Sequence, residues 1–264
     1  MSVPASVPVS APPRIRDLIR TAPDGPVPIV HAGPQAVYVA VGDRCVGLLG
    51  RHATGVPCGL RSRIRGFGDW SCSWAHMAGG TLHVDGIPLM VGRAVDVRVP
   101  PLDHAAIPHR TASPATGAAT PQAVVVGLVP PGVAEATAPP LEAVVPELLG
   151  RGTGLTPEGD DLLCGWIATH RAAGVPTPEV DRAVRAGLHR TTLLSATLLD
   201  CALDGEALPE LGRFLRAVGT ADEAHRAAEL EAVGGSSGAA LLQGARLALD
   251  ALAGDGSRSR VGAA

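Results

Sequence analysis

The sequence predicts an α+β protein: an N-terminal β-rich region that resembles a barrel or a sandwich, followed by a C-terminal all-α helical bundle. In the N-terminal half, short apolar runs are separated by glycine and proline turns, which is typical of short strands. After Pro139 the apolar residues recur at helical spacing, and glycine or proline marks the joints between segments. Aromatic residues make up only 2% of the 264 residues, so Val, Leu, Ala and Ile must fill the core.

These changes in character divide the chain into five parts. We expect a disordered Pro/Ser-rich tail, a β-rich domain, a linker that contains one strand, a helical domain that carries the main motif, and a second tail. Their expected ranges are residues 1–13, 14–110, 111–140, 141–255 and 256–264.

The β-rich domain contains two hairpin signals. Gly42-Asp43 and Asp85-Gly86 each separate two apolar runs, as two-residue hairpin turns do. Alternating valines predict a further half-buried strand, and Trp70 and Trp74 are interpreted as packing residues. The expected strands cover residues 37–41, 44–49, 82–84, 87–90 and 91–99, with one more at 123–129 in the linker.

The most densely specified stretch is GRGTGLTPEGDDLLCG, residues 150–165. Its glycines allow positive φ angles or close approach to a ligand. Thr156 and Pro157 fit the N-cap and first position of a helix, and acidic residues in the first turns suit the helix dipole. The stretch therefore predicts a glycine-rich loop that leads into a capped helix.

Two interpretations of this loop remain open. In the functional one, Gly152, Thr153, Gly154 and Thr156 bind a phosphate or carboxylate group, as amides at helix N-termini do. Asp160 and Asp161 then act as catalytic residues that polarise a substrate amide or bind a metal, with Mg²⁺ the candidate. In the structural alternative, the aspartates only cap a core helix.

Two later segments supply candidate partners for the loop. Arg190 can grip an anion in bidentate fashion, and Thr191 follows it directly. A second glycine-rich helix start, GGSSGAALLQG, aligns with the first at an offset of 79 residues and contributes Ser236 and Ser237. The small residues of both helices should let them pack closely.

Composition excludes several classes of function. The net charge of −3 gives no basis for expecting a nucleic acid or an acidic membrane as a partner. All 22 basic residues are arginines, which excludes chemistry that needs a reactive lysine. The five cysteines form no C-x-x-C pair, so no zinc ribbon or disulfide framework is predicted. Without a signal peptide or membrane span, a cytoplasmic protein is expected, and no cofactor is evident.

The motifs GTGLTPEGDDLLCG, RTTLLSATLL and GGSSGAALLQG together resemble the AllH-like family, long catalogued as a domain of unknown function. The resemblance implies a component of oxamate carbamoyltransferase, a multi-subunit transferase of allantoin degradation that converts oxalurate and phosphate to oxamate and carbamoyl phosphate. It therefore implies partner subunits and a small anionic metabolite.

One position departs from the family pattern. Ala239-Ala240 stand where an acidic residue is expected, and Ala240 lies opposite Asp161 in the internal repeat. This departure leaves two functions to compare: a subunit for carbamoyl or carboxyl transfer, and a non-catalytic scaffold or regulatory subunit. No nucleophile with its base is visible in the sequence, which favours transfer by positioning over covalent catalysis.

Overall fold

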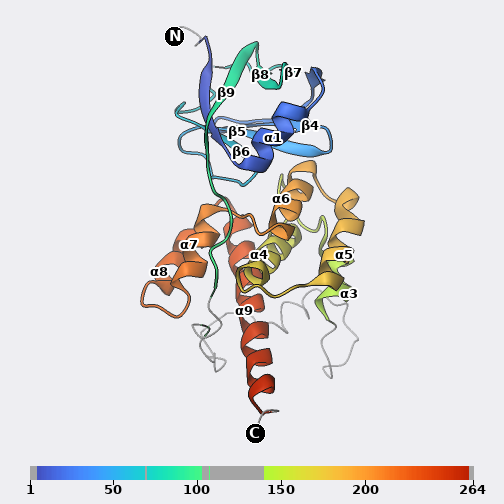
Figure 1. Cartoon of the computed structure of the whole chain (residues 1–264), viewed down its shortest axis with the longest axis vertical. Coiled ribbons are helices and arrows are strands. Elements are labelled where there is room, and N and C mark those ends of the chain that lie inside the picture. The colour runs from blue at the N-terminus through green and yellow to red at the C-terminus, as the bar shows by residue number, and fades with distance from the viewer. Residues whose placement is uncertain (1–4, 69, 103–106, 108–139, 262–264) are drawn as a thin grey trace. The chain divides into compact units, whose positions relative to one another are not determined.

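The computed structural model describes residues 5–68, 70–102, 107 and 140–261, without the side chains of residues 255–261 (Figure 1). The chain divides into two compact units, each described here by itself. The first contains Met1–Arg98, Leu193–Cys201 and Glu206–Pro209, and the second contains Val99–Thr192, Ala202–Gly205 and Glu210–Ala264.

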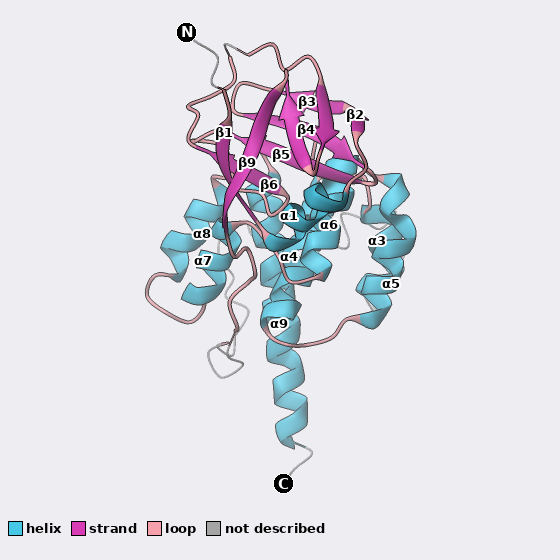
Figure 2. Cartoon of the chain, turned by 45° about the horizontal axis from the view of Figure 1, so that its top comes forward, coloured by secondary structure: helices cyan, strands magenta, loops and turns pink. Residues whose placement is uncertain are grey.

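The first unit is built on a nine-stranded sheet that curls into a nearly closed barrel (Figure 2). The strand order is β2-β7-β8-β9-β1-β6-β5-β4-β3. The strands are β1 Val7–Ala11, β2 Gly25–Val27, β3 Ile29–Ala32, β4 Ala36–Val41, β5 Arg44–Leu49, β6 Gly59–Ser62, β7 Ala75–Ala78, β8 Thr81–Val84 and β9 Ile87–Ala94, and helix α1 spans Pro13–Thr21. Together with the helices of the second unit, this barrel confirms the predicted α+β class.

The two predicted hairpins are confirmed. Strands β4 and β5 pair antiparallel around Gly42, which has a φ of 62°. Strands β8 and β9 pair antiparallel around Asp85 and Gly86, with φ angles of 49° and 81°. Positive φ at both central residues fits a type I′ turn in the second hairpin, and positive φ at the first central residue alone, Gly42, fits a type II′ turn in the first. The turn residues therefore set the register of both hairpins.

Two expectations for the N-terminal half differ from the structure. Residues 7–11, expected in a disordered tail, form strand β1 between β6 and β9, because Val7, Val9 and Ala11 alternate into the core. The strand expected at residues 91–99 ends at Ala94, opposite Ala11, where its partner β1 also ends. The linker strand expected at residues 123–129 lies outside the described residues.

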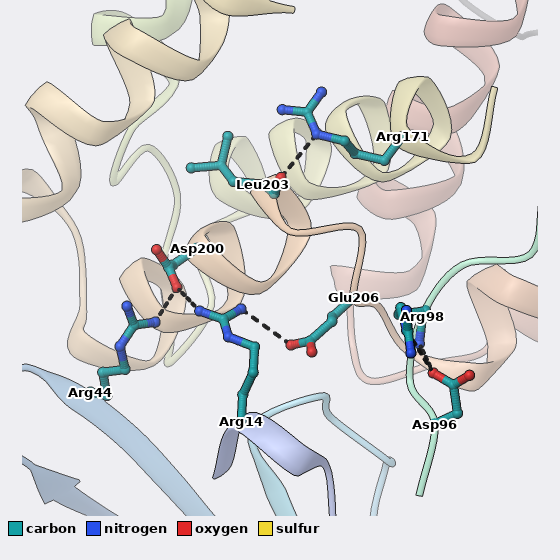
Figure 3. Close-up of polar contacts among 8 residues, drawn as sticks. All are labelled: Arg14, Arg44, Asp96, Arg98, Arg171, Asp200, Leu203 and Glu206. Atoms are coloured by element: carbon teal, nitrogen blue, oxygen red, sulfur yellow. Dashed lines mark hydrogen bonds and ion pairs between the residues drawn. The ribbon is translucent and has the colours of Figure 1, made fainter. Parts of the chain in front are cut away.

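Helix α6 (Leu193–Leu203) was expected within the helical domain, but its residues 193–201 group with the barrel. Asp200 forms ion pairs with Arg44 and with Arg14, whose Nη2 lies 2.8 Å from Asp200 Oδ2 (Figure 3). The other guanidinium nitrogen of Arg14 lies 3.3 Å from Glu206 Oε2. Because these four side chains are only partly exposed, their charges attract one another more strongly than surface pairs do.

The second unit is helical. Its elements are α3 Leu141–Leu148, α4 Glu158–Ala172, α5 Pro178–Gly187, a 3₁₀ turn Leu188–Arg190, α7 Pro209–Ala217, α8 Glu223–Glu231 and α9 Ser237–Val261. Helix α9 continues through residues 256–261, where a tail was expected. Helices α4 and α9 lie side by side in this unit (Figure 1).

Glycines allow α4 and α9 to touch through their backbones. A side chain on Gly165 would collide with the carbonyl oxygen of Leu241, and one on Gly244 would collide with the carbonyl oxygen of Leu162. Leu241 follows Leu162 by 79 positions and Gly244 follows Gly165 by the same number, so the two contacts are reciprocal. This geometry confirms the expected close packing of the two repeated segments.

The helices before α4 and α9 repeat the arrangement. A side chain on Gly159, in the first turn of α4, would collide with the carbonyl oxygen of Leu148 at the end of α3. A side chain on Gly238, in the first turn of α9, would collide with the carbonyl oxygen of Leu230 in α8. In each of the pairs α3–α4 and α8–α9, a glycine in the first turn of the second helix thus lets the two helices meet closely.

Gly244→Ala should destabilise the protein by about 2 kcal/mol or more, because the added methyl group must push two helix backbones apart. Gly254→Ala is the matched control in the same helix, since its Cβ would meet no atom within 4 Å. The control should be neutral or stabilising by up to about 1 kcal/mol, the helix-propensity gain of alanine. Urea unfolding of both variants measures the difference, and equal midpoints would contradict the backbone contact.

Candidate functional site

The glycine-rich loop has the left-handed backbone that its sequence predicts. Gly150, Gly152 and Gly154 have φ angles of 74°, 118° and 88°. A side chain on Gly152 would lie 2.7 Å from the amide nitrogen of Glu158, whereas one on Gly154 would meet nothing within 4 Å. Residues 151–154 are exposed, so the tip of the loop faces open space.

The predicted cap of α4 is wrong. The helix begins at Glu158 after Pro157, and no side chain caps it. The Oγ1 atom of Thr156 instead lies 2.8 Å from Ser237 Oγ at the start of α9. Thr156 therefore links the two repeated helix starts, and the close approach of α4 and α9 is what brings Ser237 within reach.

The amides near the helix start divide into two groups. The Gly159 amide donates to Arg151 O at 2.9 Å, and those of Asp160 and Asp161 donate to Pro157 O at 3.0 and 3.2 Å. Among the described residues, the amides of Gly152, Thr153 and Gly154 have no hydrogen-bond acceptor. The amides of Gly159, Asp160 and Asp161 in the first helical turn are therefore already paired, and those of the loop tip are available to a ligand.

Asp160 is buried and holds the loop in place. Its Oδ1 accepts a 2.9 Å hydrogen bond from the Gly150 amide, and its Oδ2 accepts one from the Thr191 hydroxyl. The neighbouring Thr192 hydroxyl donates to Leu155 O at 2.6 Å. One end of the loop, Gly150, is thus linked to Thr191 through Asp160, and the other end, Leu155, is bonded directly to Thr192.

Asp161 differs from its neighbour. Its residue is only 4% exposed, yet its Oδ2 atom has no hydrogen-bond partner among the described residues. Burial raises the pKa of this carboxyl to about 7, against an opposing effect of the Ser237 and Thr156 hydroxyls, while Asp160 and Glu158 raise the pKa further. A buried carboxyl with a raised pKa and one oxygen without a hydrogen-bond partner marks a candidate binding or catalytic position.

The structure gathers half of the predicted site residues into one network: Thr156, Asp160, Asp161, Thr191 and Ser237. The others are exposed around it: Gly152, Thr153, Gly154, Arg190 and Ser236. The carbonyl group of Arg190 lies against Gly150. The guanidinium group of Arg190 makes no ion pair with a described residue. Thr192 was missed as a site residue, although the run Arg190-Thr191-Thr192 contained the signal.

The Mg²⁺ prediction has no further support from the geometry. Within the described part of the chain, no three His, Cys, Asp or Glu side chains lie together in a way that would hold a metal ion. Both oxygens of Asp160 already accept hydrogen bonds, which leaves Asp161 Oδ2 as the open carboxylate oxygen of the pair. A metal at Asp160 and Asp161 therefore remains a prediction.

These features define an α+β chain whose helical unit joins a glycine loop to a buried pair of aspartates. Residues 148–249 match the family model described as oxamate carbamoyltransferase subunit AllH, which confirms the predicted AllH-like resemblance over the helical region. No solved structure matches the chain. None of the described helices combines the length and apolar character needed to cross a membrane.

The raised pKa of Asp161 predicts a specific pH dependence of stability. Between its unfolded pKa of 3.8 and its folded pKa of about 7, the folded state binds more protons, so stability should fall as pH rises through this window. Asp161→Asn keeps the shape and removes this titration, so its stability relative to wild type should increase by up to about 1.4 kcal/mol per pH unit. Denaturant unfolding at pH 4 to 8 measures the difference. Parallel curves for the two proteins would contradict it.

Proposed function

We propose that the chain is a subunit of an oxamate carbamoyltransferase-like complex and that its helical unit binds a phosphate- or carboxylate-bearing small molecule. Two observations carry this proposal, both within the region that matches the family: the loop amides of residues 152–154 are unpaired, and the Oδ2 atom of Asp161, at the start of the following helix, is buried without a hydrogen-bond partner. The family description, a subunit of oxamate carbamoyltransferase, supports a role in an assembly with other subunits.

The loop tip is suited to an anion. Successive amides in a glycine-rich turn form a concave set of donors, and the N-terminus of α4 adds a partial positive charge. Gly154 leaves the space above the amides open. The exposed side chains of Arg151 and Arg190 supply the positive charge that must offset Glu158.

The two aspartates receive different roles. Asp160 holds the loop through Gly150 and Thr191, so it is a positioning residue. The Oδ2 atom of Asp161 lacks a hydrogen-bond partner, so Asp161 is the residue assigned to contact the ligand. In its protonated form it donates a hydrogen bond to an anion, and in its ionised form it accepts one from an amide.

Transfer by positioning fits the rest of the chain. All five cysteines are reduced and buried, and burial raises the pKa of the Cys45, Cys72 and Cys201 thiols to about 12, 11 and 12. Such thiols are poor nucleophiles at neutral pH. We infer that the subunit holds one reactant in place while donors stabilise the charge that develops on it.

The second candidate function is a scaffold or regulatory subunit. The observation that favours it is that the Asp160 network satisfies the loop internally, as a purely structural turn would. The two functions differ in whether the loop tip binds an anion.

Phosphate or carbamoyl phosphate should raise the melting temperature of the isolated chain. At a hundredfold excess over Kd, the expected stabilisation is about 2.7 kcal/mol. Gly154→Val places a branched side chain over the amides and should abolish the effect. Gly174→Val is the matched control: Gly174 also has a positive φ (68°) and no atom within 4 Å of its Cβ, but it follows the far end of α4. A thermal shift that persists in the Gly154 variant would exclude the loop tip as the anion site, and the scaffold function would then be favoured.

The isolated chain should show little turnover, because the site provides positioning groups without a nucleophile. Asp161→Asn should lower the carbamoyl phosphate formation of the assembled complex, or its ligand affinity, by tenfold or more, equivalent to about 1.4 kcal/mol. Robust phosphorolysis of oxalurate by the single chain would overturn the subunit assignment, and full activity of the variant complex would remove Asp161 from the site.

A further inference from the structure

One outward face of the barrel unit carries proline, methionine and stacked aromatic rings, two of them histidines, across five neighbouring strands. In the sheet register, Pro26, His76, His83 and Pro88 form one row over β2, β7, β8 and β9, and Met90 of β9 pairs with Pro8 of β1. With Trp74 these residues are called the apolar face. Trp74 and Met90 are each 50% exposed, which is unusual for large apolar side chains that serve only the fold.

Trp74 was expected to be a packing residue, but its side chain is half exposed. Its ring stacks on His76 at a centroid distance of 5.0 Å, and His76 stacks on His83 at 4.5 Å, with interplanar angles of 14° and 15°. Trp70, in contrast, packs edge-on against Phe67. The stack presents one exposed aromatic surface on a rigid base.

The loop that carries Trp74 is held by a single carboxylate. Asp85 accepts hydrogen bonds from the Ser71 hydroxyl and from the amides of Cys72, Ser73 and Trp74, at 2.9, 2.7, 2.9 and 3.4 Å. These donors lower the pKa of Asp85 against the effect of its desolvation. Cys72 and Asp85 are also the two non-glycine residues with positive φ in the described chain. At Asp85 this conformation belongs to the hairpin turn, whereas at Cys72 it is backbone strain of a kind often kept where it positions a functional side chain.

A basic rim adjoins the apolar face. Ser10 of β1 pairs with Arg61 of β6 on one side and with Arg93 of β9 on the other, so the two arginines flank it on the exposed side of the sheet. Neither guanidinium forms an ion pair with a described residue. The rim is two residues along β1 from Pro8, so one partner surface can cover both features.

We propose that the apolar face and its basic rim bind another protein subunit of the complex, through an apolar patch flanked by acidic residues. A rigid, exposed tryptophan surrounded by apolar side chains and arginine is the composition of a protein-interface hot spot. The positively charged rim requires an acidic partner surface, which favours a different chain. A second copy that docked through the same face would place its own arginines against the rim, and the like charges would repel. The nature of the partner rests on the proposed function, whereas the surface itself does not.

The test uses the complex purified through a tag on this chain, with Trp70→Phe and Trp166→Phe changes that leave Trp74 as the single tryptophan. Iodide should quench Trp74 fluorescence in the free chain and at least several-fold less in the complex. Trp74→Ser combined with Arg93→Glu should weaken the affinity for the isolated partner chain by tenfold or more. Val30→Ser and Arg20→Glu, exposed changes elsewhere on the same unit, are the matched controls and should leave the affinity unchanged.

Equal quenching in the complex, unchanged affinity of the double variant, shielding of Trp74 already in the free chain, or self-association through this face would overturn the proposal. Recovery of no partner chain with the tagged protein, or binding of this face to DNA or anionic vesicles instead, would overturn it too. The phosphate-induced thermal shift of the double variant should stay at the wild-type value. If phosphate causes no thermal shift in the wild-type chain, that result would count against the proposed ligand site and would not affect the interface result.

Discussion

The contact on which the candidate site depends is the meeting of two helix backbones at Gly165 and Gly244. Because neither helix has a side chain at that point, the two can approach until one backbone touches the other. Their first turns then lie near each other, and Thr156 of one repeat meets Ser237 of the next. Asp161 is enclosed at this junction. Packing, rather than any single polar bond, is therefore what creates an unusual carboxyl.

Two adjacent carboxyls in one helical turn acquire opposite environments from this packing. Asp160 faces the loop and residue 191, and hydrogen bonds hold both its oxygens. Asp161 faces the second repeat, where the equivalent position is Ala240 and no cation is among the groups that shift its pKa. A buried carboxyl with one oxygen that lacks a hydrogen-bond partner is costly, and the proposed ligand would supply that partner. The asymmetry between Asp161 and Ala240 also leaves the internal repeat with one acidic site rather than two.

Local signals predicted much of this from sequence. Gly42 and Asp85-Gly86 defined hairpins because such turns need positive φ, and the glycines of residues 150–154 defined the loop for the same reason. Signals that depend on distant partners failed. Strand β1 looked like part of a disordered tail because Pro8 and Ser10 hid the alternation of Val7, Val9 and Ala11. The expected Thr156 cap is replaced by a contact with Ser237, 81 residues away. The different hydrogen-bond partners of Asp160 and Asp161 depend on which residues the fold brings next to each, and two adjacent aspartates in the sequence do not specify those neighbours.

The central claim is that the loop tip and the start of the second repeat together hold a small anion. Hydrogen–deuterium exchange of the isolated chain with and without saturating carbamoyl phosphate tests it most directly. The account predicts slower exchange in two segments only, the loop at residues 150–161 and the start of α9 at residues 233–240. Unchanged exchange in both segments, or protection confined to other parts of the chain, would contradict it.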